Sequence, residues 1–176
     1  MLEQKSEREL IYMRDAGRVV AETHRELKNA LRIGMTTKEL DQIAEDYIRS
    51  KGAVPSFKGY SGYPASICAS VNDVVVHGIP DERVLNEGDI LSLDIGAILN
   101  EYNGDAAQTL PVGEISPLAQ RLLQVTEESL YKGIAQAQVG NRLFDISHAV
   151  QKHVEAHGFS VVRDFCGHGI GREMHE

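Results

Sequence analysis

Residues 89–111, DILSLDIGAILNEYNGDAAQTLP, predict a β-hairpin, because two apolar β-type runs flank a short polar turn. If Leu99 and Asn100 form its tip, Asp94 and Asp105 lie directly opposite each other. Their Cβ atoms would then be about 4.5–5.5 Å apart on one face. Two carboxylates at such a spacing repel each other by roughly 1 kcal/mol in water and by more inside a protein. A divalent cation between them would remove this repulsion, so the hairpin indicates a metal site.

Other interpretations of this hairpin stay open. The run Asn103–Asp105 has the composition of a turn, so that both aspartates would simply face water. The register is also an assumption, because a slip of one residue would put the two aspartates on opposite faces.

Two histidines are candidates for the same chemistry. His168 lies between two glycines, which leave its imidazole uncrowded, and a neutral imidazole is a good ligand for a transition metal. The alternative is a loop histidine without a ligand. His77 follows the apolar run Val74–Val76, which predicts a histidine at the end of a buried strand. There it would contact substrate or pair with the backbone.

Elements outside the hairpin are predicted from hydrophobic periodicity. Helices are expected over residues 6–31, 36–52, 117–138 and 142–157, and further strands over 67–71, 74–76 and 159–164. Thr36 and Glu39 have the spacing of a capping box at the start of the second helix.

The second and fourth of these helices are bracketed by glycines, at Gly34 and Gly52 and again at Gly140 and Gly158. In each case a long helix precedes and a strand follows, which indicates two structurally similar halves. Chance similarity of two amphipathic helices is the alternative. If the repeat is real, the second half stops before its own hairpin, and we expect the sequence to be truncated.

The composition is that of a globular protein. Apolar residues make up 42% of the 176 residues, and 26 acidic against 18 basic residues give a formal net charge of −8. This balance argues against a generic nucleic-acid binder. Cys68 and Cys166 fit no Cys-x-x-Cys pattern, and neither a signal peptide nor a membrane span is recognisable. We therefore expect a cytoplasmic protein.

Four motifs together resemble those of the type I methionine aminopeptidases, in order and spacing as well as in sequence. They are Val76–Pro80 (VHGIP), Asp94–Gly96 (DIG), Asn103–Asp105 (NGD) and Cys166–Glu176 (CGHGIGREMHE). The resemblance implies an α+β protein with the pita-bread fold of the creatinase and aminopeptidase class. A single, partial catalytic domain would span residues 1–176. Its pseudo-twofold halves would be residues of about 5–112 and from about 113, the second incomplete.

The resemblance also implies a function, the metal-dependent removal of the initiator methionine from nascent proteins, with preference for a small second residue. Asp94, Asp105 and His168 would be the metal ligands. His77 and His175 would be catalytic and would contact the scissile peptide. The substrate-binding residues would be these two histidines with Phe57, Tyr60, Tyr63, Cys68 and Met174. The complete family site holds two divalent ions, which could be cobalt, manganese, iron or zinc.

The sequence departs from the family pattern in places. Members commonly have histidine where Ser61 stands and an aromatic residue where Met174 stands, although methionine keeps the pocket apolar. Two further glutamate ligands of the family lie beyond residue 176, and Glu176 is not one of them. We therefore expect the chain as written to bind a single ion weakly, and its activity stays open.

Two other functions remain as alternatives. One is a truncated, non-catalytic protein that binds peptide N-termini, and the other is a proline-directed aminopeptidase related to prolidase. By resemblance, the expected partners are nascent polypeptide N-termini and the ribosome exit region, with no direct nucleic-acid or membrane partner. The complete enzyme is expected to be a monomer.

Overall fold

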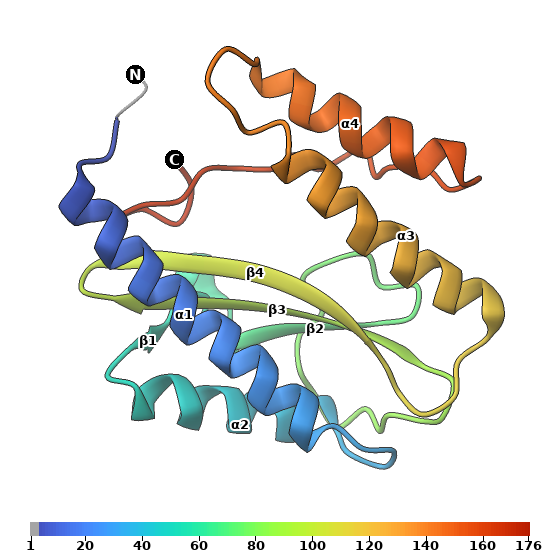
Figure 1. Cartoon of the computed structure of the whole chain (residues 1–176). Helices are drawn as coiled ribbons and strands as arrows, with labels where there is room; N and C mark the ends of the chain where they lie inside the picture. The colour runs from blue at the N-terminus through green and yellow to red at the C-terminus, as the bar shows by residue number, and fades with distance from the viewer. Residues whose placement is uncertain (1–3) are drawn as a thin grey trace. The chain divides into compact units, whose positions relative to one another are not determined.

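The structure is a computed structural model that describes residues 4–176, and these form two units (Figure 1). The first unit contains the described residues up to Ile115 together with His168–Glu176. The second unit contains Ser116–Gly167. Every residue expected at the metal site or in the substrate pocket belongs to the first unit.

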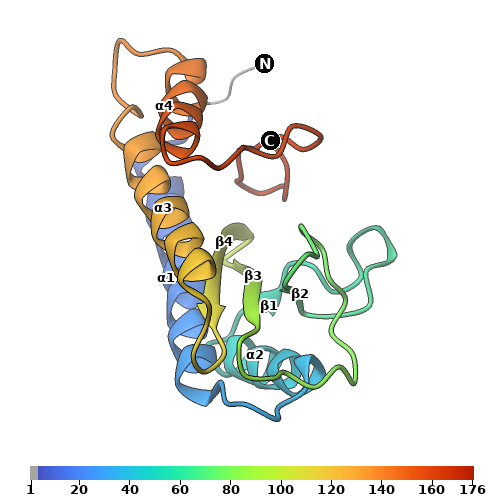
Figure 2. The same cartoon turned by 90° about the vertical axis from the view of Figure 1, so that its right-hand side faces the viewer.

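An antiparallel sheet of four strands is the framework of the first unit (Figures 1 and 2). Its strands are β1 (Val54–Pro55), β2 (Ile67–Val71), β3 (Ile90–Leu99) and β4 (Tyr102–Pro111). β4 pairs with β3 along its whole length, while β2 and β1 pair with successive parts of the other edge of β3. The predicted hairpin is therefore confirmed, and its first strand is the centre of the sheet.

Two helices, α1 (Glu7–Ala30) and α2 (Thr37–Ser50), pack on one face of this sheet. Both begin with a capping box, in which the hydroxyl of Ser6 or Thr36 accepts a hydrogen bond from the backbone three residues later. The predicted helices over residues 6–31 and 36–52 are thus confirmed, with each end within two residues of the expected limit.

The main hydrophobic core lies between these helices and alternate residues of the strands. Its largest fully buried side chains are Val20, Leu27, Leu40, Ile48, Ile67, Val71, Leu85, Leu91, Leu93, Ile95 and Val112. On β3 the core residues are odd-numbered, so the even-numbered residues point to the opposite face. That opposite face, free of α1 and α2, is where Asp94 lies.

The second unit contains two helices, α3 (Pro117–Ile134) and α4 (Leu143–Ala156), which pack against each other. Ser116 caps α3 and Pro117 occupies its first turn, where a missing N–H costs nothing. The third predicted helix ends earlier than expected, at Ile134 instead of Gln138. Within the described residues, none of the helices is long and apolar enough to cross a membrane.

Two predicted strands are wrong. Residues 74–76 are irregular and Val74, Val75 and Val76 are all exposed, so this apolar run is no buried strand. Residues 159–164 are irregular as well, because no neighbouring strand in the described part of the chain supplies a ladder of hydrogen bonds.

Candidate metal centre

The tip of the β3–β4 hairpin differs from the predicted one. Leu99 pairs with Tyr102, so the tip is Asn100–Glu101 and not Leu99–Asn100. Both tip residues have positive φ, 52° and 70°, as a two-residue type I′ turn requires. Asparagine adopts this left-handed conformation readily, but Asn100 belongs to both the predicted and the observed turn, so its identity does not decide between them.

The two aspartates nevertheless share a face. Asp94 pairs with Ala107, and Asp105 pairs with Gly96, so the aspartates are diagonal neighbours and the predicted direct pairing is wrong. The pairing is shifted by two residues relative to the prediction, and a shift by an even number keeps the side chains on the predicted face.

The two carboxyl groups are close enough to interact directly. Burial, followed by the like charge of Asp105 and a hydrogen bond between the two side chains, raises the pKa of Asp94 to about 7. It is energetically unfavourable for two carboxyl groups this close together to be charged at the same time, unless a cation lies between them. The donor set therefore fits a hard or borderline divalent metal ion.

His168 joins the aspartates from the C-terminal segment. Its Nε2 lies 3.6 Å from Oδ2 of Asp105. Its Nδ1 lies 3.1 Å from the carbonyl oxygen of Gly169, a contact that favours the proton on Nδ1 and leaves Nε2 as the electron-pair donor. The three residues predicted as ligands are thus brought together on one face.

Asn103 fastens the C-terminal segment to the sheet. Its backbone N–H donates to the carbonyl of Gly171 over 2.8 Å, and its side-chain amide donates to the carbonyls of Gly171 and Arg172. Its Oδ1 accepts from the hydroxyl of Ser56, so the buried amide is fully used. Asn103 and Ser56 were not among the predicted site residues, although Asn103 stands inside one of the four motifs.

Two motif glycines make room for these neighbours. A Cβ on Gly104 would lie 2.6 Å from the carbonyl carbon of Ala16, so only glycine lets α1 approach β4 this closely. A Cβ on Gly96 would lie 2.7 Å from the ring of Phe57. Gly96 therefore lets the aromatic ring lie against β3, beside the aspartates.

An apolar cluster adjoins the aspartates. Phe57, Cys68 and Met174 are buried together, and Tyr63 packs against them. Cys68 pairs with Asp94 across β2 and β3, so this cluster and the predicted metal ligands are contiguous. Burial raises the pKa of Cys68 to about 11, so its thiol stays neutral at physiological pH and is a weakly polar wall.

Two further residues predicted to bind substrate are Tyr60, from the loop before β2, and His175, from the C-terminal segment. Tyr60 and His175 are in contact, with the tyrosine hydroxyl 2.9 Å from Nδ1 of the histidine. The rings of His175 and His168 have centroids 4.2 Å apart. Ser61, next to Tyr60, has a left-handed backbone with φ 47°. The structure thus brings His175 and Tyr60 beside the predicted ligands.

His77 lies in an exposed loop and not at the end of a buried strand as predicted. Its backbone has φ 58°, and the next residue, Gly78, is tied to β2. The N–H of Gly78 donates to the hydroxyl of Ser70, and its carbonyl accepts from the N–H of Ala69 and the hydroxyl of Tyr63. The loop is therefore held beside β2 by hydrogen bonds to the backbone of Gly78.

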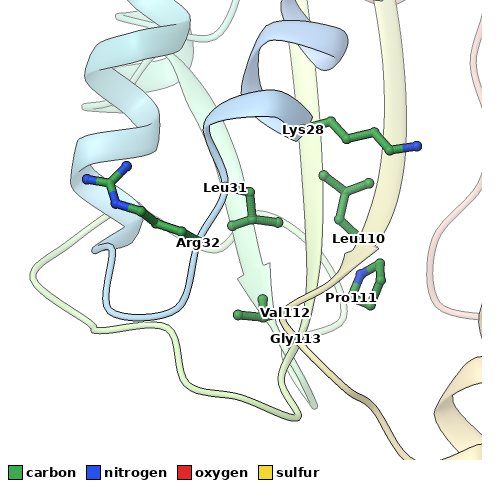
Figure 3. Close-up of a pocket in the computed structure, with 7 residues that line it drawn as sticks. All are labelled: Lys28, Leu31, Arg32, Leu110, Pro111, Val112 and Gly113. Carbon is green, nitrogen blue, oxygen red and sulfur yellow. The ribbon is translucent and has the colours of Figure 1, made fainter.

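A separate pocket of about 190 Å³ lies elsewhere on the first unit (Figure 3). It is lined by Lys28, Leu31, Arg32, Leu110, Pro111, Val112 and Gly113. Leu110 and Asp105 differ by an odd number of residues along β4, so they point to opposite faces. This pocket holds none of the residues predicted for the site.

Comparison with known proteins agrees with this geometry. The family model for metallopeptidase family M24 matches residues 11–176. The chain is 60% identical over 172 residues to methionine aminopeptidase 1 of Bacillus subtilis (strain 168), covering 98% of this chain and 69% of that protein. The structure of methionine aminopeptidase from Rickettsia prowazekii matches with a TM-score of 0.98 at 40% identity, covering 100% of this chain and 71% of that one.

A more distant neighbour bears on the proline-directed alternative. Xaa-Pro dipeptidase from Bacillus anthracis matches with a TM-score of 0.85 but only 23% identity, over 98% of this chain and 47% of that one. This likeness shows a shared fold alone. The far higher identity to methionine aminopeptidases does not favour the alternative.

Proposed function

Because this chain belongs to the methionine aminopeptidases of metallopeptidase family M24, we propose that its sheet face removes N-terminal methionine from peptides. The fold is the pita-bread fold of that family. The observation that carries the proposal is the contiguity of Asp94, Asp105 and His168 with an apolar cluster on the same face.

Asp94, Asp105 and His168 are the proposed metal ligands. A divalent ion held by them would supply a Lewis acid for the peptide carbonyl and would lower the pKa of a water molecule. Cobalt, manganese, iron and zinc all suit a mixed carboxylate and imidazole set. Three protein ligands also leave positions at the ion open for substrate.

His77 and His175 are the proposed hydrogen-bond donors to the scissile peptide. When the Tyr60 hydroxyl donates to Nδ1 of His175, the ring proton lies on Nε2, which is then a hydrogen-bond donor. A donor at the point where negative charge develops on the carbonyl oxygen stabilises the transition state. Tyr60 is therefore a positioning residue for His175.

The cluster of Phe57, Cys68, Met174 and Tyr63 is the proposed pocket for the methionine side chain. An apolar wall gains from burying the thioether, and the neutral thiol of Cys68 adds no charge to it. Met174 is itself flexible and apolar, so it can adapt to the bound side chain. A small second residue is the expected preference beyond this pocket.

The proposal also covers the substrates and the cellular location of this activity. The proposed substrates are N-termini of nascent polypeptides, which the chain meets in the cytoplasm near the ribosome exit region. The complete enzyme would act as a monomer. Residues of about 5–112, which lie in the first unit, are the proposed first pseudo-twofold half of the fold, and α3 and α4 begin the second half.

The test is hydrolysis of a Met-Ala-Ser peptide by the 176-residue chain with added Mn²⁺ or Co²⁺. We expect metal-dependent release of methionine, slower than that of the Bacillus subtilis relative assayed alongside, because three protein ligands hold an ion less tightly than a larger set. Asp94→Ala should abolish the release, and a Leu-Ala-Ser peptide should be cleaved much more slowly.

Three outcomes would contradict the proposal. A folded chain that releases no methionine with either metal would contradict the function for these residues. Release that persists in Asp94→Ala would contradict the ligand assignment. Cleavage of an Ala-Pro peptide in preference to the methionine peptide would favour the proline-directed alternative.

A further inference from the structure

A group of three side chains in the second unit takes no part in the proposed peptidase site. Glu128 lies on α3, His153 lies on α4, and His157 is the C-cap residue of α4. One potential ligand atom from each of them lies within 4.8 Å of the other two. The two histidines are four residues apart, a spacing that puts both side chains on one face of a helix.

Close packing holds this group in place. A Cβ on Gly133 would lie 3.0 Å from Cγ2 of Val150, so α3 and α4 approach closely at that point. Val125 on α3 and Val154 on α4 are buried; Val125 lies three residues before Glu128, and Val154 directly follows His153. The backbone that carries the three side chains is therefore fixed by apolar contacts that do not involve them.

The hydrogen bonds leave donor atoms of the right kind for a metal. Nε2 of His153 lies 3.0 Å from Oε2 of Glu128, with side-chain exposures of 15% and 40%. Nδ1 of His157 lies 2.8 Å from the carbonyl oxygen of His153, which requires the proton on Nδ1 and leaves the electron pair on Nε2. The same pattern, in which a backbone carbonyl orients a ligating imidazole, is common in metal sites.

We propose that Glu128, His153 and His157 bind a divalent transition-metal ion of the zinc type. Two imidazole nitrogens and one carboxylate oxygen form a set that Zn²⁺ accepts, with a fourth position left for water. Ligands around tetrahedral zinc are about 3.3 Å apart, given bonds of about 2.0–2.1 Å. The His153–Glu128 pair is already near this spacing, and side-chain rotation of His157 closes the rest.

This site differs from the proposed peptidase centre in position and in ligand chemistry. All three ligands come from the second unit, whereas Asp94, Asp105 and His168 belong to the first. A metal here joins α3 to the C-terminal end of α4, so the site is structural. Zinc binding to the folded state would stabilise the helix pair through mass action.

The experiment measures Zn²⁺ affinity by competition with a chromophoric chelator, using the full 176-residue chain with Asp94→Ala to disable the other site. We expect one zinc ion per chain in this background. His157→Gln and, on the other helix, Glu128→Gln should each weaken binding at least about tenfold, since even loss of an outer-shell partner costs about 10–100-fold. His148→Gln, an exposed histidine on α4, is the matched control and should leave the affinity unchanged.

A second readout is independent of affinity. In the same background, Zn²⁺ should shift the imidazole NMR signals of His153 and His157 and leave those of His148 unchanged. The proposal is overturned if the Asp94→Ala chain binds no zinc, or if His157→Gln and His148→Gln bind it equally well. Because peptide hydrolysis plays no part in either readout, failure here is distinguishable from failure of the proposed function.

Discussion

Gly104 and Asp105 are adjacent residues that point to opposite faces of β4. The residue type at each position is therefore constrained by the neighbours on its own face. Asp105 points to the proposed metal ligands, while Gly104 lies under α1 with space for a hydrogen atom only. The residue that allows the helix to pack is therefore next to a proposed metal ligand, and neither can be replaced without affecting its own side of the strand.

Gly104→Ala is expected to destabilise the fold by about 1–3 kcal/mol, because the added methyl group collides with backbone atoms of α1 that cannot rotate away. Gly17→Ala is the matched control. A Cβ there meets nothing within 4 Å, and alanine is the better helix former, so stability should rise by roughly 0.5–1 kcal/mol. Urea unfolding measures both, and equal shifts of the midpoint in the same direction would refute this account.

His24 should make stability depend on pH. Its Nε2 donates to the carbonyl of Ala106, and burial lowers its pKa below the ordinary value of 6.5. As pH falls through 6.5, the unfolded chain takes up a proton at His24 while the folded chain does not, so stability is lost. The stability that neutral His24 contributes is fully present above pH 6.5.

The variant His24→Gln removes this titration and keeps an amide donor for Ala106. Unfolding free energies measured at pH 7.5, 6.5 and 5.5 should therefore fall less steeply for the variant than for the parent chain. Parallel slopes would mean that His24 is not the group responsible.

Residue identities predicted the candidate site better than they predicted its geometry. The four motifs led to all three proposed ligands and to the apolar cluster that the structure assembles. The pairing of Asp94 with Asp105 was wrong, because nothing in residue composition fixes which two of Leu99, Asn100 and Glu101 form the turn. Only the backbone conformation, positive at Asn100 and Glu101, decides it.

The C-terminal segment of the first unit has no regular structure, and the buried residue Asn103 is a main attachment of it to the sheet, beside the burial of Met174 and the contact of Tyr60 with His175. Asn103 supplies three hydrogen bonds to Gly171 and Arg172, while His168 and His175 flank these attachment points. The positions of both histidines therefore depend on a residue that touches neither.

Asn103→Ala should loosen this segment without removing a ligand. We expect Co²⁺ affinity to fall about 10–100-fold, as for loss of an outer-shell partner, and cleavage by a protease after residue 167 to accelerate. Asn141→Ala, at an exposed asparagine of the second unit, is the control and should change neither. Unchanged Co²⁺ affinity in Asn103→Ala would show that His168 is positioned by other contacts or is not a ligand.

Helices were predictable as elements because their signals are local. Capping boxes and periodic apolar residues identify α1 and α2 within two residues at each end. Strands depend on partners that are distant in sequence. As a result, some predicted strands are absent from the structure, and one observed strand was not predicted. The apolar run Val74–Val76 is an exposed loop, whereas the two-residue strand β1, which pairs with Ala97 and Ile98, had no signal in the sequence.

The chain forms two units with unequal cores. The first unit holds the continuous core of α1, α2 and the sheet, whereas in the second only a few side chains, including Val125 and Val154, are buried. The repeated pattern of two helices that the sequence suggested corresponds to α1 with α2 and α3 with α4. The metal proposed at Glu128, His153 and His157 would add stability to the unit that has the smaller core.

The first unit is discontinuous along the chain, and this has a consequence for how the molecule is made. Synthesis from the N-terminus releases the sheet and both aspartates first, and His168 and His175 only after the whole second unit has been added. At about 5–20 residues per second, that interval is roughly 3–10 s. During it, the emerging first unit has both carboxylates but neither imidazole of the proposed site. The two histidines therefore join the aspartates only after the second unit has been made, when Gly171 and Arg172 reach Asn103.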